Sequence, residues 1–170
     1  PGRIWAVLIG IDGYPTYPLC GCVDDTLAMG DYLTKDLGVP RERIQCLLAP
    51  TSHRNVYTNI GYPTRANILC LLHSLATNPA IRCGDPIIIY FAGHGTRYLW
   101  TEEDVNIESE EEHDAERLQE SVEALCPMDR NTFDVSGSLV TDITDRELNT
   151  ILSQIYRTKG NRITFILDCC

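Results

Sequence analysis

Four short, mainly apolar segments, rich in β-branched residues, recur along this chain of 170 residues. They span residues 4–9, 43–48, 86–91 and 162–167. Continuous runs of this length, without polar alternation, are typical of strands that are buried on both faces of a sheet. Helix patterns fill the segments between them. The alternation predicts an α/β fold with a mainly parallel sheet, right-handed crossovers and helices on both faces.

Three helices are expected between these strands. The first covers residues 27–37, after the acidic pair Asp24 and Asp25, which suits a helix N-terminus, and before Gly38. The second covers residues 64–75 and the third opens with a capping box at residues 144–147 and ends at Gly160. The expected inward faces consist of Ile68, Leu71, Leu72 and Leu75 in the second helix, and of Leu148, Ile151, Leu152 and Ile155 in the third.

Composition favours one globular domain over residues 1–170, with 44% hydrophobic and 22% charged residues. No apolar run approaches the roughly 20 residues that span a bilayer, and no signal peptide is visible, so we expect a cytoplasmic protein. There are eight cysteines. Cys46 and Cys70 lie in apolar patterns, where a thiol is usually a small buried side chain. Cys20 and Cys22 lack a second pair to complete a zinc site, so we expect reduced thiols.

The net charge of −10 is concentrated in one segment. Residues 102–120 contain ten acidic side chains and one basic one, Arg117, so nine of the ten excess negative charges lie there. We expect a solvated acidic loop at about residues 101–121. The rest of the chain is nearly neutral and has no basic patch, which disfavours nucleic-acid binding.

Function in parallel α/β sheets gathers at the carboxyl ends of the strands. There the third run leads into Gly93-His94-Gly95, and the fourth ends in Asp168-Cys169-Cys170. A cysteine nucleophile needs a neighbouring base, because a free thiol with a pKa of about 8.5 is mostly protonated at neutral pH. The Gly95 N–H could serve an oxyanion hole. On these residues alone, a catalytic pair and a buried cysteine beside a structural histidine are about equally supported.

Five blocks in this order resemble the caspase-like peptidase clan and, within it, the metacaspase-like proteins of fungi. The blocks are RIWAVLIGIDGY, LCGCVDDTLAM, YFAGHG, LCPMD and ITFILDCC. The resemblance covers nearly the whole chain and implies a caspase-like three-layer sandwich that acts as a cysteine endopeptidase on protein or peptide substrates. It implies His94 as the catalytic base, Gly95 as an oxyanion donor and Cys170, rather than Cys169, as the nucleophile.

The same resemblance implies cleavage after Arg or Lys, with Asp25 and Asp168 forming an acidic pocket for the cationic side chain. Asp25 could equally be a first-turn helix acid. Calcium, as an activator rather than a required cofactor, is a further implication, and its candidate ligands are Asp104 and Asp129. A solvated insertion, and for Asp129 a turn cap, are the alternatives.

The sequence stops at Cys170, where the family continues with HSG and a smaller portion carrying two further strands. We therefore expect this chain to need a C-terminal caspase-like portion, and to be inactive alone. A non-catalytic signalling or assembly module is the main alternative, although both His94 and Cys170 are present. A flavodoxin-like binding domain is disfavoured, because no Gly-rich phosphate loop follows the first strand.

Overall fold

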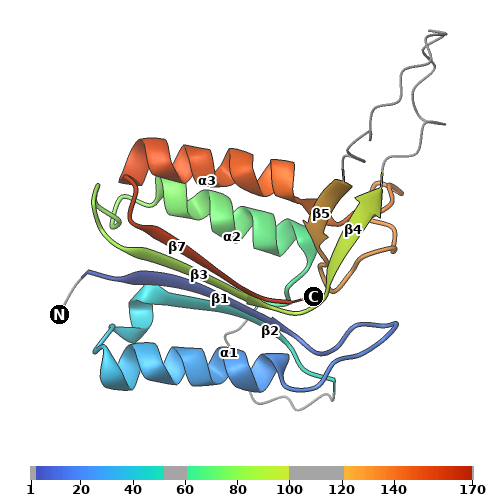
Figure 1. The fold of residues 1–170 in the computed structure, drawn as a ribbon, viewed down its shortest axis with the longest axis horizontal. Helices are drawn as coiled ribbons and strands as arrows, with labels where there is room; N and C mark the ends of the chain where they lie inside the picture. The colour runs from blue at the N-terminus through green and yellow to red at the C-terminus, as the bar shows by residue number, and fades with distance from the viewer. Residues whose placement is uncertain (1–2, 52–60, 100–120, 170) are drawn as a thin grey trace, which may run out of the picture.

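The computed structural model describes residues 3–51, 61–99 and 121–169, and its centre is a four-stranded parallel sheet (Figure 1). The strand order is β2-β1-β3-β7. The strands are β1 (Trp5–Ile11), β2 (Ile44–Ala49), β3 (Ile87–Ala92) and β7 (Ile163–Asp168). All four predicted strands are confirmed, each beginning one residue later than expected. All seven residues of β1 are buried, as the continuous apolar run predicts for a central strand.

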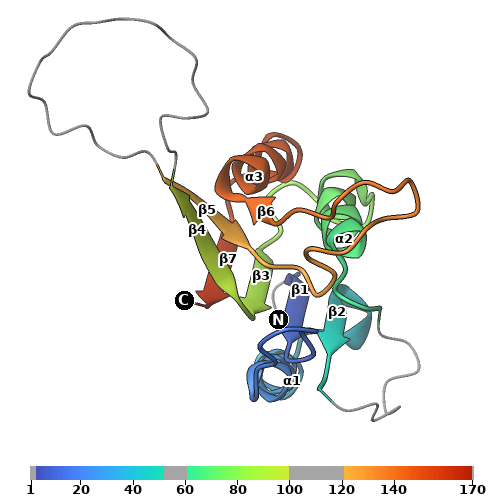
Figure 2. The ribbon, with the colours of Figure 1, turned by 90° about the vertical axis from the view of Figure 1, so that its right-hand side faces the viewer.

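Helices cover both faces of this sheet, as Figures 1 and 2 show. On one face lie α2 (Arg65–Thr77) and α3 (Asp145–Lys159), and on the other lies α1 (Cys22–Asp31), which continues as a π-helical turn, Tyr32–Asp36. One hydrophobic core, containing Phe91 and Ile155, lies under α2 and α3. A second core, containing Leu8 and Leu33, lies under α1. The predicted three-layer α/β architecture is confirmed.

The start of α1 differs from the sequence prediction. The helix begins at Cys22 rather than at Leu27, so Asp24 and Asp25 lie inside its first turn. The reason is a distant cap: the buried Asp12 carboxylate accepts the Cys22 N–H at 2.9 Å and the Val23 N–H at 3.3 Å. Two helix N–H groups are thereby satisfied from the loop after β1.

The other two helices begin as predicted. Thr64 and Thr144 are the N-cap residues of α2 and α3, and each hydroxyl accepts a backbone N–H of the first turn. The Glu147 side chain of the expected capping box turns instead to Arg65, whose Nη2 donates to both carboxylate oxygens at 2.7 and 2.8 Å. This ion pair ties α2 to α3. No helix in the described ranges is long and apolar enough to cross a membrane.

A small antiparallel sheet was not predicted. It has the order β4-β5-β6 and consists of β4 (Gly95–Leu99), β5 (Ser121–Leu125) and β6 (Ile143–Thr144). Figure 2 shows it beside the end of β7. Residues 100–120, which include the acidic stretch, connect the paired positions Leu99 and Ser121, but lie outside the described residues. An internal ion pair supports the sheet: Arg130 Nη2 lies 2.7 Å from the buried Asp142 carboxylate, which also accepts the Tyr98 hydroxyl.

The cysteines are only partly as expected. None of the seven described cysteines forms a disulfide, in line with the reduced state expected for them. Cys46 is half-buried, but the expectation that Cys70 is a buried thiol is wrong, because it lies on the exposed side of α2. The α2 core face consists of Ile68, Leu72 and Leu75, with the predicted Leu71 partly buried against the same core.

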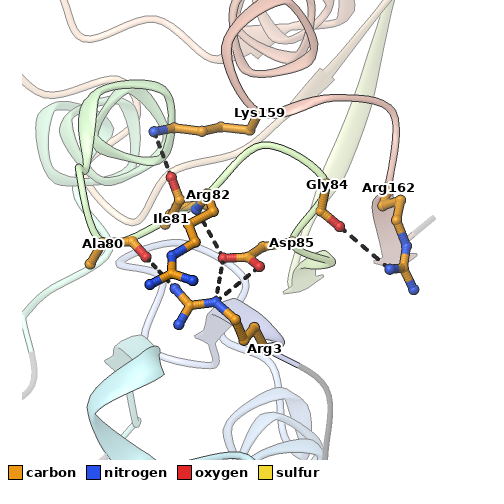
Figure 3. Close-up of polar contacts among 8 residues, drawn as sticks. All are labelled: Arg3, Ala80, Ile81, Arg82, Gly84, Asp85, Lys159 and Arg162. Carbon is orange, nitrogen blue, oxygen red and sulfur yellow. Dashed lines mark hydrogen bonds and ion pairs between the residues drawn. The ribbon is translucent and has the colours of Figure 1, made fainter.

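A polar cluster lies at the end of the main sheet where its strands begin (Figure 3). Arg3 Nε lies 3.1 Å from both oxygens of the buried Asp85 carboxylate, and the Arg82 N–H donates to Oδ2 at 2.9 Å. Lys159, at the end of α3, donates to the carbonyl oxygens of Asn78 and Ile81. Burial raises the pKa of Asp85, but the bonds from Arg82 and Arg3 outweigh it and hold the pKa below its usual value.

We expect Asp85→Asn to lower the free energy of unfolding by about 1–3 kcal/mol near neutral pH, because a charged hydrogen-bond acceptor is lost. A carboxyl whose pKa is lower in the folded chain stabilises the fold above its unfolded pKa of about 4. This contribution is lost as the pH falls through the folded value. Urea titrations should therefore show the largest difference near pH 7 and a smaller one at about pH 3.

The matched control for this measurement is Asp31→Asn. The Asp31–Lys35 pair is exposed, with side chains 57% and 70% accessible, so the change should stay below about 0.5 kcal/mol. A loss for Asp85→Asn that is equally large at both pH values would contradict the ion-pair explanation.

Candidate active site

The turn between β3 and β4 carries His94, and the preceding residue, Gly93, has no side chain. At Gly93, a Cβ atom would lie 2.6 Å from the Tyr14 hydroxyl oxygen and 3.1 Å from the Phe91 ring. Only glycine fits such a close approach. Gly93 therefore makes room for Tyr14 beside the His94 turn.

The backbone of His94 is held on both sides. Its N–H donates to the Tyr14 hydroxyl at 2.9 Å, and its carbonyl oxygen accepts the Cys126 N–H at 3.0 Å. The Tyr14 hydroxyl in turn donates to the Cys126 carbonyl oxygen at 2.9 Å. The rings of Tyr14 and His94 also pack together, with centroids 4.6 Å apart. The position of His94 therefore depends on the loop that follows β1 and on the end of β5.

The His94 imidazole is oriented by a backbone carbonyl. Its Nε2 lies 2.8 Å from the carbonyl oxygen of Tyr17. A carbonyl oxygen only accepts, so this bond requires a hydrogen on Nε2 and leaves Nδ1 as the basic nitrogen of the neutral ring. Tyr17 is 80% exposed and has a φ of 57°, a left-handed conformation that is rare for a tyrosine. Tyr17 thus has a disfavoured backbone conformation at the point where its carbonyl oxygen bonds to the His94 imidazole.

The backbone pairing also directs the Gly95 N–H. Gly95 is opposite Leu125 in the antiparallel β4–β5 pair, and the Cys126 N–H bonds to the His94 carbonyl oxygen. This pattern makes Gly95 and Leu125 a non-hydrogen-bonded pair, so the Gly95 N–H points away from β5. Because β4 is an edge strand of the small sheet, this N–H faces its open side. The candidate oxyanion donor is therefore directed away from its own sheet.

The end of β7 lies directly beside this turn. Asp168 is opposite Ala92 in the parallel β3–β7 pair, and the Gly93 N–H donates to the Asp168 carbonyl oxygen at 3.3 Å. The structure therefore brings the His94 turn and Asp168 to one corner of the sheet, as expected. Cys169 is half-buried and packs against the core under α2 and α3. Cys170 lies outside the described residues.

The two candidate pocket acids act on the same neighbours. The Tyr90 hydroxyl donates to Asp168 Oδ2 at 3.1 Å. The pKa of Tyr90 is raised by burial, then by the bond and charge of Asp168, and also by the charge of Asp25. The pKa of the Cys22 thiol rises to about 11, chiefly through burial and Asp12, with further contributions from Asp168 and Asp25. The charges of Asp25 and Asp168 thus act on one patch, which contains Tyr90 and Cys22. Asp25 also fits its alternative role as an acid in the first turn of α1.

Asp129, a candidate calcium ligand, has a structural partner. Its Oδ1 accepts the Arg65 N–H at 2.8 Å, at the first residue of α2. Asp104, the other candidate, lies outside the described residues. Within the described ranges, no group of three or more His, Cys, Asp or Glu side chains could hold a metal ion.

A cleft of about 600 Å³ adjoins the corner, between the small sheet, α3 and β7. Gly95 and Cys169 line it, together with the apolar side chains of Leu125, Leu148 and Leu167. The groups that the sequence analysis missed around this corner are Asp12, Tyr14, Tyr17 and Tyr90. The motif IDGY contains two of them, but nothing local in it indicates partners far along the chain.

Comparison with known proteins gives consistent results. The family described as "Metacaspase, peptidase C14 domain" matches residues 5–170. Metacaspase-9 of Arabidopsis thaliana is 29% identical over 97% of this chain and 42% of its own length. Metacaspase-1A of Aspergillus oryzae is 28% identical over 97% of this chain and 33% of its own length. The chain thus spans well under half the length of these relatives.

A crystal structure of a Geobacter sulfurreducens protein shares the fold. It matches all of this chain and 51% of its own, with a TM-score of 0.61 and 17% sequence identity. At this identity the likeness concerns the fold alone.

Proposed function

This chain belongs to the metacaspase peptidase C14 family, a group of caspase-like cysteine peptidases, and we propose that it supplies the His94–Cys170 dyad of an endopeptidase that cleaves after Arg or Lys. The observation that carries the proposal is the corner at which the His94 turn is hydrogen-bonded to the last residue of β7. Cys170 follows two residues later. Since the chain covers 42% or less of the two metacaspases compared above, the activity of the whole protein is part of the proposal.

The proposed reaction starts with His94. Its Nδ1 accepts the Cys170 thiol proton, and the thiolate attacks the scissile carbonyl carbon. The negative charge that develops on the carbonyl oxygen is stabilised by the N–H groups of Gly95 and Cys170. The imidazolium then donates its proton to the departing amine, and the acyl-enzyme forms. Water, deprotonated by the same nitrogen, hydrolyses the thioester and releases the acid product.

One feature of His94 and one of Gly95 support these roles. The Tyr17 carbonyl fixes the tautomer in which Nδ1 is basic, and it remains hydrogen-bonded when the ring becomes cationic. The open orientation of the Gly95 N–H supports its role in the oxyanion hole. Substrate recognition is proposed for the patch near Asp25 and Asp168, where two carboxylates favour a guanidinium or ammonium group.

The test is covalent labelling of the full-length protein with an Arg-directed cysteine probe. We expect mass spectrometry to find the label on Cys170, and Cys170→Ala to abolish labelling. Cys169→Ala is the matched control and should keep most of it, because the half-buried Cys169 packs against the core. Loss of the label in Cys169→Ala alone would show that the nucleophile within the pair is misassigned.

A further inference from the structure

Tyr14 contacts the proposed active site without facing the substrate. It is 4% exposed and lies in the loop after β1, eighty residues from His94 in sequence. Its hydroxyl makes two bonds: it accepts the His94 N–H at 2.9 Å and donates to the Cys126 carbonyl oxygen at 2.9 Å. A phenol has one hydrogen to donate, so the donor is fully used in this position.

The bonded peptide is adjacent to the candidate oxyanion donor. His94 and Gly95 are consecutive, so rotation of the His94 backbone would also redirect the Gly95 N–H. The Cys126 N–H holds the carbonyl side of His94, and Tyr14 holds the amide side. Gly93 allows the hydroxyl to come this close, because a Cβ there would lie 2.6 Å from it.

We propose that Tyr14 is a positioning residue, whose hydroxyl sets the direction in which the Gly95 N–H faces the developing oxyanion by linking His94 to the end of β5. This proposal rests on the proposed peptidase function. Burial raises the pKa of the Tyr14 phenol, so the hydroxyl keeps its hydrogen at neutral pH. In Tyr14→Phe, the His94 N–H and the Cys126 carbonyl lose their shared partner. The amide side of His94 is then no longer held, while the Cys126 N–H still holds its carbonyl side.

The experiment compares full-length wild type with Tyr14→Phe in two reactions. Hydrolysis of a P1-Arg peptide passes through an oxyanion, whereas alkylation of Cys170 by iodoacetamide does not. We expect kcat to fall about 10–100-fold, below the full effect of deleting an oxyanion donor, with KM changed less than about twofold. The pH profile of alkylation should be unchanged, because His94 keeps its Tyr17 bond. Equal losses in both reactions, or wild-type kcat, would overturn the proposal.

Two controls separate this result from loss of structure and from failure of the proposed function. Tyr98→Phe also removes a hydrogen-bonded hydroxyl, whose partner is the Asp142 carboxylate rather than the His94 turn, and should keep kcat within about twofold. If Tyr14→Phe does not fold, Gly93→Ala displaces the same hydroxyl and should give the same selective loss of kcat, while a wild-type kcat would overturn the proposal. Wild type that neither hydrolyses peptide nor is labelled at Cys170 would refute the proposed function itself, and with it the role of Tyr14.

Discussion

Replacing His94 with Ala in the full-length protein is expected to lower kcat/KM for a P1-Arg peptide by at least about 10³-fold. The imidazole is proposed both to take the proton of Cys170 and to protonate the leaving amine, so both chemical steps lose their proton carrier. The variant should remain folded. The backbone bonds that hold the turn, from His94 to Tyr14 and Cys126, do not involve the imidazole.

Stopped-flow or steady-state hydrolysis together with thermal unfolding would check this expectation. His73→Ala is the matched control, because His73 is exposed on α2 and lies away from the corner. Its kcat/KM should be within about twofold of wild type. If His94→Ala retained more than about a tenth of the wild-type activity, another group would have to be the base.

The main sheet could be predicted from the sequence because its signal is local. Each strand is a continuous apolar run, and parallel strands place their carboxyl ends at one edge, so His94 and Asp168 were expected together. The small sheet could not be predicted in the same way. Arg97, Tyr98 and Leu99 in β4 are all exposed, so β4 has neither the apolar run nor the alternation that marks a strand.

The bonds that position His94 and the start of α1 could not be predicted, because their partners are distant along the chain. Asp12 caps a helix ten residues away, and the Tyr17 carbonyl meets an imidazole seventy-seven residues away. A capping residue normally precedes its helix directly, so the sequence alone predicts that α1 starts after Asp24 and Asp25. Such bonds depend on how the whole fold places the loops relative to one another, which no local pattern in the sequence records.

The pocket prediction concerns Asp168, whose carboxylate is oriented by the Tyr90 hydroxyl at 3.1 Å. Asp168→Ala is expected to reduce cleavage after Arg about 100-fold or more. A P1 guanidinium would desolvate the exposed Asp168 carboxylate on binding, and removing one partner of a desolvated charge pair costs about 3–5 kcal/mol. Cleavage after Asp should not emerge, because Asp25 still places negative charge at the same patch. The measurement is kcat/KM for three peptides that differ only in Arg, Lys or Asp at P1.

Asp24→Ala separates a local role from a general charge effect. Asp24 is exposed in the first turn of α1, next to Asp25. Replacing it with Ala removes the same charge from the protein as Asp168→Ala does. We expect its effect on cleavage after Arg to stay below about threefold, because Asp24 is not part of the proposed pocket and a charge that does not contact the substrate is screened by solvent and salt. A comparable loss in both variants would assign the preference to the overall negative field. A wild-type preference for Asp at P1 would remove both Asp25 and Asp168 from the pocket, because two carboxylates cannot favour a third.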